Sequence, residues 1–310
     1  MAILFSIRYN VTSTILDIEV HSMVCRESRK KKMKKIFLTL LLFSSIFAQA
    51  NRLLTLVPTA HASSIGNVSL PMTNPARNHI MKDKFTFGKV NWLGNIVNDM
   101  NYLHGNLEKG AWDASVLIFN YGQQLETDVN GVVTGDFSPM SSVWSAGWGG
   151  LVKGYNVGFT AKFISHDLYV QRTFGTAFDV ATYLPKVYKD LDIDVALRNF
   201  GFAPKFGDTE TMLPTSLNVG MTYPYKQWTF YEQHNFFKKF RTFGSGVSYN
   251  YNNMIWGKAG YYWDRNHDLS YPTFGMDLKY DRYFIGFSYI YGDETLPVSN
   301  TFRLTINLEL

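Results

Sequence analysis

The sequence predicts an all-β protein, a transmembrane barrel of about 14 antiparallel strands with a short N-terminal plug segment. Three observations favour this class: a secretory leader, segments in which apolar and polar side chains alternate, and connections that alternate between short and long. Successive side chains of a strand point to opposite faces, so alternation gives a strand one apolar face and one polar face. Transmembrane barrels consist of such strands, joined by short turns at one end and longer loops at the other.

The N-terminal region has the three parts of a secretory leader in the expected order. A basic stretch at 29–35 is followed by an apolar run at 36–47, and Ala48 and Ala50 are small residues where signal peptidase needs them. The apolar run is shorter than the roughly 20 residues of a membrane-spanning helix. We therefore expect a signal peptide region at 1–50 that is cleaved before Asn51, with an uncleaved anchor as the alternative.

The start of this region is unusually long. Residues 1–32 precede Met33 and carry no export signal of their own. A signal peptide normally begins a few residues before its basic stretch. We therefore expect translation to start near Met33, with Met23 as the alternative, and residues 1–32 to be an artefact of the gene model.

The leader also holds the excess of positive charge. Of the 30 basic and 25 acidic residues, 8 and 3 lie at positions 1–50, so the 260 residues from 51 to 310 carry 22 of each. A neutral mature chain gives no support for nucleic-acid binding. Cys25, the one cysteine, lies in the leader too, which excludes disulfides and thiolate metal sites from the mature chain.

Alternation is clearest in the last ten residues. The even positions Phe302, Leu304, Ile306, Leu308 and Leu310 are all apolar, whereas every odd position from 301 to 309 is polar. We expect the even face to contact lipid and the odd face to line the lumen.

Fourteen strands are predicted, and their even number places both termini in the periplasm. They are expected near 84–91, 97–104, 111–121, 141–149, 154–164, 176–183, 191–198, 215–223, 227–235, 243–251, 254–263, 273–280, 283–291 and 301–310.

The connections distinguish a barrel from a soluble sandwich. Tight turns are expected at Pro224-Tyr225-Lys226, Asn252-Asn253 and Asp281-Arg282, and longer polar loops at 199–214, 236–242, 264–272 and 292–300. A sandwich has no reason for this alternation. The segment 51–83 does not alternate and is interrupted by prolines, so we expect it to be a plug or periplasmic segment ahead of a barrel at 84–310.

Catalytic signals are weak. The histidines of the mature chain, which are His61, His79, His104, His166, His234 and His267, have no zinc-ligand spacing. No nucleophile elbow and no phosphate-binding glycine loop is present. We expect no enzyme, cofactor or metal site, with an outer-membrane lipid hydrolase that uses His166 or His234 as a minor alternative. A row of charged residues at Asp190, Asp192, Asp194 and Arg198 either lines a polar passage or pairs with basic neighbours.

Two segments resemble the PorV/PorQ proteins among the FadL-like barrels, PorQ most of all. The first runs from 58 to 69 with Gly66 and continues to Asn74-Pro75-Ala76. The second, at 127–138, holds Asp128, Gly131, Gly135 and Phe137. The resemblance implies a non-enzymatic outer-membrane partner in type IX protein secretion or surface attachment. FadL-like relatives imply the alternative, a transporter of hydrophobic small molecules.

The longer loops are candidate interaction sites. Those at 122–140, 199–214 and 292–300 carry more apolar side chains than a solvated loop needs, among them Phe137, Met140, Phe200, Phe202, Phe206 and Leu296. They either form an exposed platform or fold inward and close the barrel mouth. The expected partners are outer-membrane lipid, secretion-system proteins or exported cargo, or a hydrophobic ligand; nucleic acid is not expected.

The leader gives the first testable prediction. N-terminal sequencing of the membrane-purified protein should begin at Asn51, because the residues that signal peptidase needs end at Ala50. Recovery of peptides from residues 1–32 would contradict a translation start near Met33.

Overall fold

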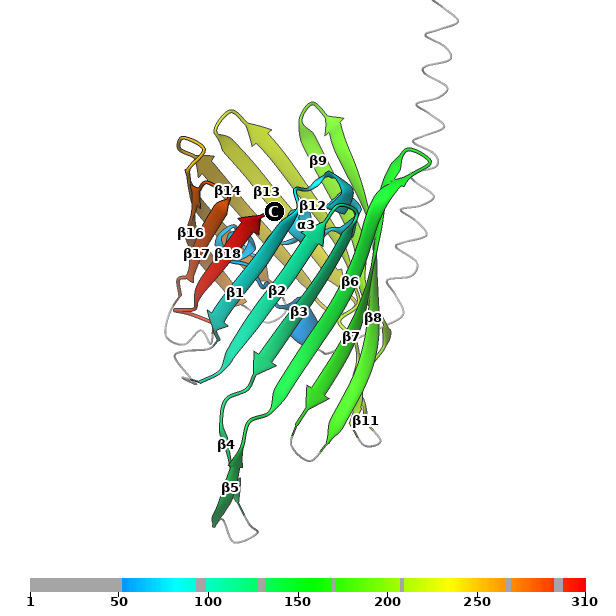
Figure 1. The fold of residues 1–310 in the computed structure, drawn as a ribbon, viewed down its shortest axis with the longest axis vertical. Helices are drawn as coiled ribbons and strands as arrows, with labels where there is room; N and C mark the ends of the chain where they lie inside the picture. The colour runs from blue at the N-terminus through cyan, green and yellow to red at the C-terminus, as the bar shows by residue number, and fades with distance from the viewer. Residues whose placement is uncertain are drawn as a thin grey trace, which may run out of the picture. The chain divides into compact units, whose positions relative to one another are not determined.

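A computed structural model describes residues 52–92, 99–127, 132–168, 171–206, 209–265, 269–292 and 298–310. Within these ranges, fourteen antiparallel strands close into one barrel, in which β1 completes the ring against β18 (Figure 1). The predicted fold class and strand number are therefore confirmed. The leader residues Ala48, Ala50 and Asn51 lie outside the described residues, so the cleavage site stays a prediction.

The barrel strands have 8 to 17 residues and are longer than the roughly five or six residues of a typical strand in a globular protein. In chain order they are β1 (Lys84–Asn91), β2 (Asn101–Lys109), β3 (Trp112–Asn120), β6 (Met140–Val152), β7 (Tyr155–Asp167), β8 (Arg172–Tyr188), β9 (Leu191–Phe202), β12 (Ser216–Tyr225), β13 (Trp228–Phe237), β14 (Arg241–Asn250), β15 (Ile255–Asp264), β16 (Leu269–Tyr280), β17 (Tyr283–Ile290) and β18 (Phe302–Glu309). Two small hairpins stand on the longer connections: β4 (Gln124–Thr127) with β5 (Val133–Phe137), and β10 (Lys205–Phe206) with β11 (Thr209–Glu210).

Two expectations need correction. The second strand runs over 101–109 and not 97–104, because Gly105 interrupts its outer face and Tyr102 points inward, which blurs the alternation. Pro224 lies inside β12, and the turn follows at 226–227. Proline lacks an amide donor, and it is accommodated there because the ladder between β12 and β9 already ends at Thr222.

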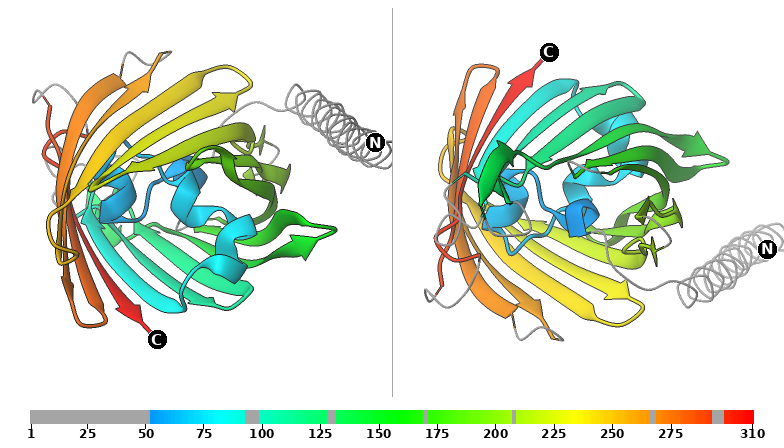
Figure 2. Two further views of the ribbon diagram at one scale, coloured as in Figure 1. Left: turned by 90° about the horizontal axis from the view of Figure 1, so that it is seen from above. Right: turned by 90° about the horizontal axis from the view of Figure 1, so that it is seen from below.

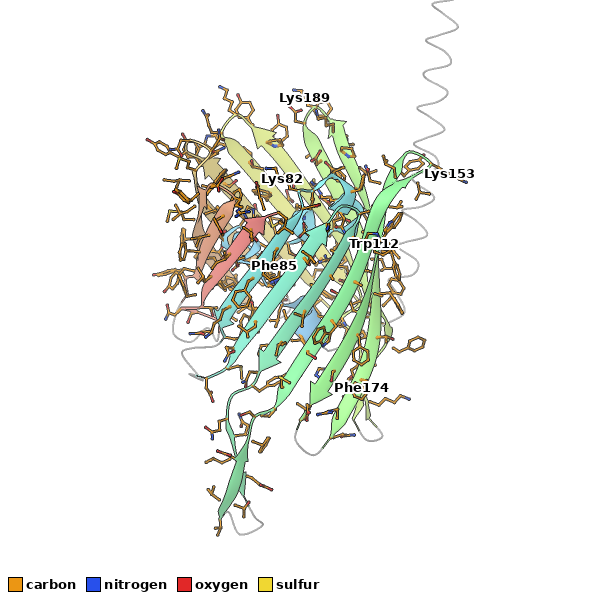
Figure 3. The ribbon with its side chains drawn as sticks, in the orientation of Figure 1. Lys82, Phe85, Trp112, Lys153, Phe174 and Lys189 are labelled. Atoms are coloured by element: carbon orange, nitrogen blue, oxygen red, sulfur yellow. The ribbon has the colours of Figure 1, made fainter. Side chains whose placement is uncertain are left out.

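The wall is apolar outside and polar inside. Phe85, Trp112 and Phe174 project from the outer wall with exposed fractions of 43%, 63% and 54% (Figure 3). In β18, Ile306 is outward and 39% exposed, whereas Thr305 points inward and is 2% exposed. The predicted orientation of the last strand is thus confirmed.

The N-terminal segment lies inside the ring of strands (Figure 2). It forms η1 (Arg52–Thr55), α2 (Ala60–Ser64), α3 (Leu70–Thr73) and η2 (Pro75–Ile80), which together make up the plug. The helix α2 packs on β15–β18, α3 on β9 and β12, and η2 on β3 and β6–β8. None of the helices in the described part of the chain is long and apolar enough to cross a membrane.

The position of an outward-facing residue along the barrel wall should determine how much a charged substitution lowers the free energy of unfolding. Ile306→Arg should lower the free energy of unfolding in lipid vesicles by about 2–4 kcal/mol, because a guanidinium near the bilayer midplane is poorly solvated. Tyr280→Arg is the matched control, since Tyr280 is 77% exposed beside the tight turn, where such a cost falls to about 0–1 kcal/mol. Equal losses in both variants, measured by denaturant titration, would contradict the placement of the wall.

Candidate functional site

Glycines of the wall let the plug backbone lie directly against the barrel. Gly149 on β6 and Gly158 on β7 are opposite each other in the ladder. A Cβ atom added to either would collide with the main chain of Pro75 or Ala76. The Asn-Pro-Ala segment therefore rests on a part of the wall that has no side chains.

A second pair of opposed wall glycines contacts the turn after α2; we call each such pair a glycine seat. Gly246 and Gly260 are also opposite each other, and a Cβ on either would collide with Ile65. Gly66 itself has a φ of 76°, a conformation that favours glycine, and its amide donates to Thr273 Oγ1 at 3.0 Å. Both the positive φ and the close approach of the wall require glycine at position 66.

Side chains of the wall satisfy the plug amides that its short helices leave unpaired. Gln233 Oε1 accepts hydrogen bonds from the amides of Ser69 and Leu70 at 2.9 and 2.7 Å. Thr305 Oγ1 accepts one from the amide of Ala60 at 2.8 Å. Buried amides without partners would cost free energy, so these bonds fix the plug at defined positions.

A buried ion pair anchors the end of the plug. Nε and Nη2 of Arg77 each donate to Asp194 at 2.7 Å, and Asn74 Nδ2 donates to the same carboxylate at 2.7 Å. The side chain of Asp194 is 0% exposed, and the guanidinium of Arg77 lies 3.9 Å from the ring centroid of Tyr183. Of the two interpretations of this acidic row, pairing with a basic group is therefore correct for Asp194, and the plug supplies the partner.

A second polar cluster joins α2 to β15 and β16. Lys258, whose side chain is fully buried, donates to Asp277 and to Nδ1 of His61. Burial of the imidazole, and next the ammonium of Lys258, lowers the pKa of His61. Nδ1 of His61 also lies 2.8 Å from Oδ2 of Asp277, so the three side chains form one cluster.

The plug divides the lumen into two cavities. The one beneath the longer loops has a volume of about 540 Å3, and the one at the tight-turn end about 620 Å3. Charged side chains such as Lys84, Glu108 and Lys162 line the cavity at the tight-turn end. Leu53 and Leu56 line both cavities, so the segment at 53–57 is part of the partition between them.

The loop-side cavity is rich in aromatic and aliphatic side chains. Its lining includes Trp92, Phe119, Tyr121, Leu213, Tyr262 and Val298. The ring centroids of Phe119 and Tyr121 are 4.7 Å apart, and those of Tyr262 and Tyr271 are 5.0 Å apart. Its volume lies in the range of small-ligand sites, and charged side chains, among them Lys238, Lys239 and Arg303, complete its lining.

The apolar residues predicted in the longer loops lie in different places. Phe200 and Phe202 are in β9, and Met140 begins β6, so these three are strand residues and not loop residues. Phe202 is 75% exposed, whereas Leu213 is 4% exposed and faces the cavity.

Two residues of the second resemblance segment lie on the β4–β5 hairpin. Gly135 and Phe137 belong to β5, which pairs with β4. Asp128, Gly131 and Leu296, like the side chain of Phe206, lie outside the described residues.

Sequence reasoning missed most of the residues that build the cavity and hold the plug. Trp92, Tyr102, Gln233, Lys258 and Asp277 were not singled out. Lys258 and Asp277 each stand as a charge on a lumen-facing position of an alternating strand, which is ordinary for a barrel. They form an ion pair with each other, and His61 of the plug helix α2 joins that pair.

The histidines considered for a hydrolase are strand residues. His166 lies in β7 and not in a solvated loop, and its Nδ1 is 2.6 Å from Oγ of Ser141. Ser141 is 1% exposed on the lumen side, so its hydroxyl cannot reach a lipid at the outer wall. Within the described ranges, no group of three or more His, Cys, Asp or Glu residues could hold a metal ion.

Comparisons with known proteins establish the fold. No protein-family model and no curated protein matches the chain. Among solved structures, the toluene transporter TodX of P. putida aligns with a TM-score of 0.52 at 12% identity, covering 80% of this chain and 97% of TodX. The Ralstonia pickettii toluene transporter TbuX aligns with a TM-score of 0.50 at 13% identity, covering 79% and 95%. At this identity the likeness shows the fold alone, a closed barrel of antiparallel strands.

The ion pair of the plug gives a direct test. Asp194→Asn should weaken docking of η2 by about 3 kcal/mol, because it removes the carboxylate that pairs with both Nε and Nη2 of Arg77 and leaves only the more distant Asp192. Trypsin should then cleave after Arg77 in the purified barrel. Asp192→Asn is the control, since Asp192 lies 3.8 Å from Arg77 and keeps a hydrogen-bonding group for Tyr183. Resistance of the Asp194 variant to trypsin would show that the ion pair does not hold the plug.

Proposed function

We propose that this protein passes small hydrophobic molecules across the outer membrane. The observation that carries the proposal is the aromatic cavity of about 540 Å3 beneath the longer loops. A cavity of this size and lining takes up apolar ligands from a membrane or from solution. The TodX and TbuX barrels, which share the fold, are toluene transporters. This proposal replaces the secretion role as the main interpretation.

Passage of a ligand through the lumen requires movement of the plug segment that separates the two cavities. Residues from Pro58 onward are held by glycine seats, wall hydrogen bonds and ion pairs. The segment at 53–57 lacks the glycine seats: none of the described wall glycines has main-chain atoms of this segment among its nearest neighbours, and Val57 accepts a hydrogen bond from Tyr102 at 2.8 Å. Displacement of this segment would join the two cavities into one route through the lumen.

Replacement of an aromatic residue that lines the loop-side cavity should lower the affinity for a hydrophobic ligand. Trp92→Ala should bind the fluorescent hydrophobe 1-N-phenylnaphthylamine about tenfold more weakly, because a buried aromatic contact surface is lost. The main chain at Trp92 keeps its hydrogen bond to Met100, so the barrel should still fold. The measurement is a fluorescence titration of the purified barrel, with toluene as a competitor.

Trp112→Ala is the matched control for this titration. Trp112 is 63% exposed on the outer wall at the tight-turn end, far from the cavity lining. It should bind the probe as the natural protein does. A natural protein that binds no probe, or equal effects of both tryptophan variants, would contradict a hydrophobe site at this cavity.

The β4–β5 hairpin favours a second candidate, the partner in protein secretion. The hairpin extends away from the barrel at the end that carries the longer loops (Figure 1). Leu125, Val132 and Val133 are 67%, 59% and 56% exposed on it. Exposed apolar side chains of this kind often mark protein contacts. If this role is correct, exported proteins should co-purify with the natural chain from its host but not with Leu125→Asn/Val133→Thr, whereas Trp92→Ala should retain them.

A further inference from the structure

A groove of about 610 Å3 lies on the outer wall, where β13, β14 and β15 approach the longer loops. Its floor is aromatic and consists of Phe236, Phe243, Tyr261 and Trp263. Tyr261 and Trp263 are 46% and 44% exposed, and they alternate along β15 with lumen-facing residues. The groove therefore faces the membrane and is separate from both lumen cavities.

Two arginines stand side by side at the rim of this groove. The amide of Arg265 donates to the carbonyl of Arg241 at 3.3 Å, which fixes the two residues next to each other. Both side chains are exposed, and the guanidinium of Arg241 lies 5.5 Å from the ring centroid of Phe236. Neither guanidinium has an ion-pair partner among the residues that the structure describes. Two neighbouring positive charges without a counter-charge favour an anionic ligand.

The acidic groups that the structure describes near the groove are engaged elsewhere. Glu232 Oε1 is 2.7 Å from Nε2 of His234, so this carboxylate pairs with the imidazole below the rim. Asp264 precedes Arg265 but is 6% exposed and belongs to the lumen face. Among the residues that the structure describes, the rim of the groove is therefore cationic and its floor is aromatic.

We propose that this groove binds an anionic, phosphate-bearing lipid of the outer leaflet. The headgroup phosphate would lie between Arg241 and Arg265, because a guanidinium donates paired hydrogen bonds to phosphate oxygens. An acyl chain would lie on the aromatic floor. A free phosphate would contact the arginines but not the aromatic residues of the groove. The presence of both features therefore favours a lipid. The inference rests on the outer-membrane location that the proposed function assumes, but not on transport.

The test uses native mass spectrometry of the purified barrel in detergent. Phosphatidylglycerol and lipid A are the anionic probes, phosphatidylcholine is the neutral one, and inorganic phosphate is added as a competitor. The natural chain should retain the anionic lipids in preference to phosphatidylcholine, and inorganic phosphate should not displace them. Equal retention of all lipids, or displacement by inorganic phosphate, would overturn the proposal.

Two variants locate the site. Arg241→Gln/Arg265→Gln should retain phosphatidylglycerol about tenfold more weakly, since both headgroup contacts are lost. Arg282→Gln is the matched control, because Arg282 also lies beside an aromatic ring, that of Tyr283 at 5.9 Å, but in a tight turn at the other end of the barrel. Heat-modifiable gel migration shows whether each variant is folded. An unchanged double variant that is folded would overturn the site.

The lipid site and the transport proposal fail independently. Trp92→Ala should lose the fluorescent hydrophobe and keep phosphatidylglycerol, and the arginine double variant should do the reverse. Parallel loss of both ligands in folded variants would contradict a separate lipid site.

Discussion

The main chain of the plug lies against glycines of the barrel wall, and most of the interior depends on this contact. Gly149 and Gly158 hold Pro75 and Ala76, and Gly246 and Gly260 hold the turn that contains Gly66. A side chain at any of the four wall positions would push the plug toward the lumen axis. The hydrogen bonds and ion pairs that link plug and wall, including the buried pair of Arg77 with Asp194, need this close approach.

The fixed plug in turn creates the functional surfaces. Because residues from Pro58 onward are held against the wall, the lumen space remains as two cavities with the segment at 53–57 between them. The loop-side cavity holds the aromatic cluster of Trp92, Phe119 and Tyr121, and both cavities also have charged side chains in their lining. The groove with Arg241 and Arg265 lies on the opposite face of the wall. One barrel thus offers apolar surfaces of two kinds, enclosed and lipid-facing.

Alternation in the sequence predicted the barrel, the number of strands and the orientation of β18, because lipid and lumen demand opposite side chains at successive positions. Alternation did not predict the bounds of β2, because Gly105 on the outer face and Tyr102 on the lumen face weaken the difference between apolar and polar positions. The cavity and the plug contacts could not be predicted in this way. Gln233 and Lys258 are ordinary lumen residues until the plug, more than 160 residues earlier in the chain, lies beside them. Only Gly66 and the Asn-Pro-Ala segment, singled out through a resemblance, pointed to that interface.

Hydrogen exchange of the plug amides tests the central claim most directly, namely that the wall holds the plug from residue 58 onward. The amides of Gly66, Ser69 and Leu70 donate to wall side chains, so they should exchange as slowly as amides of the barrel ladder in the detergent-solubilised protein. The segment at 53–57 should exchange faster. Exchange of Gly66, Ser69 and Leu70 at the rate of an exposed turn such as Lys153–Gly154 would contradict a plug that is fixed by the glycine seats.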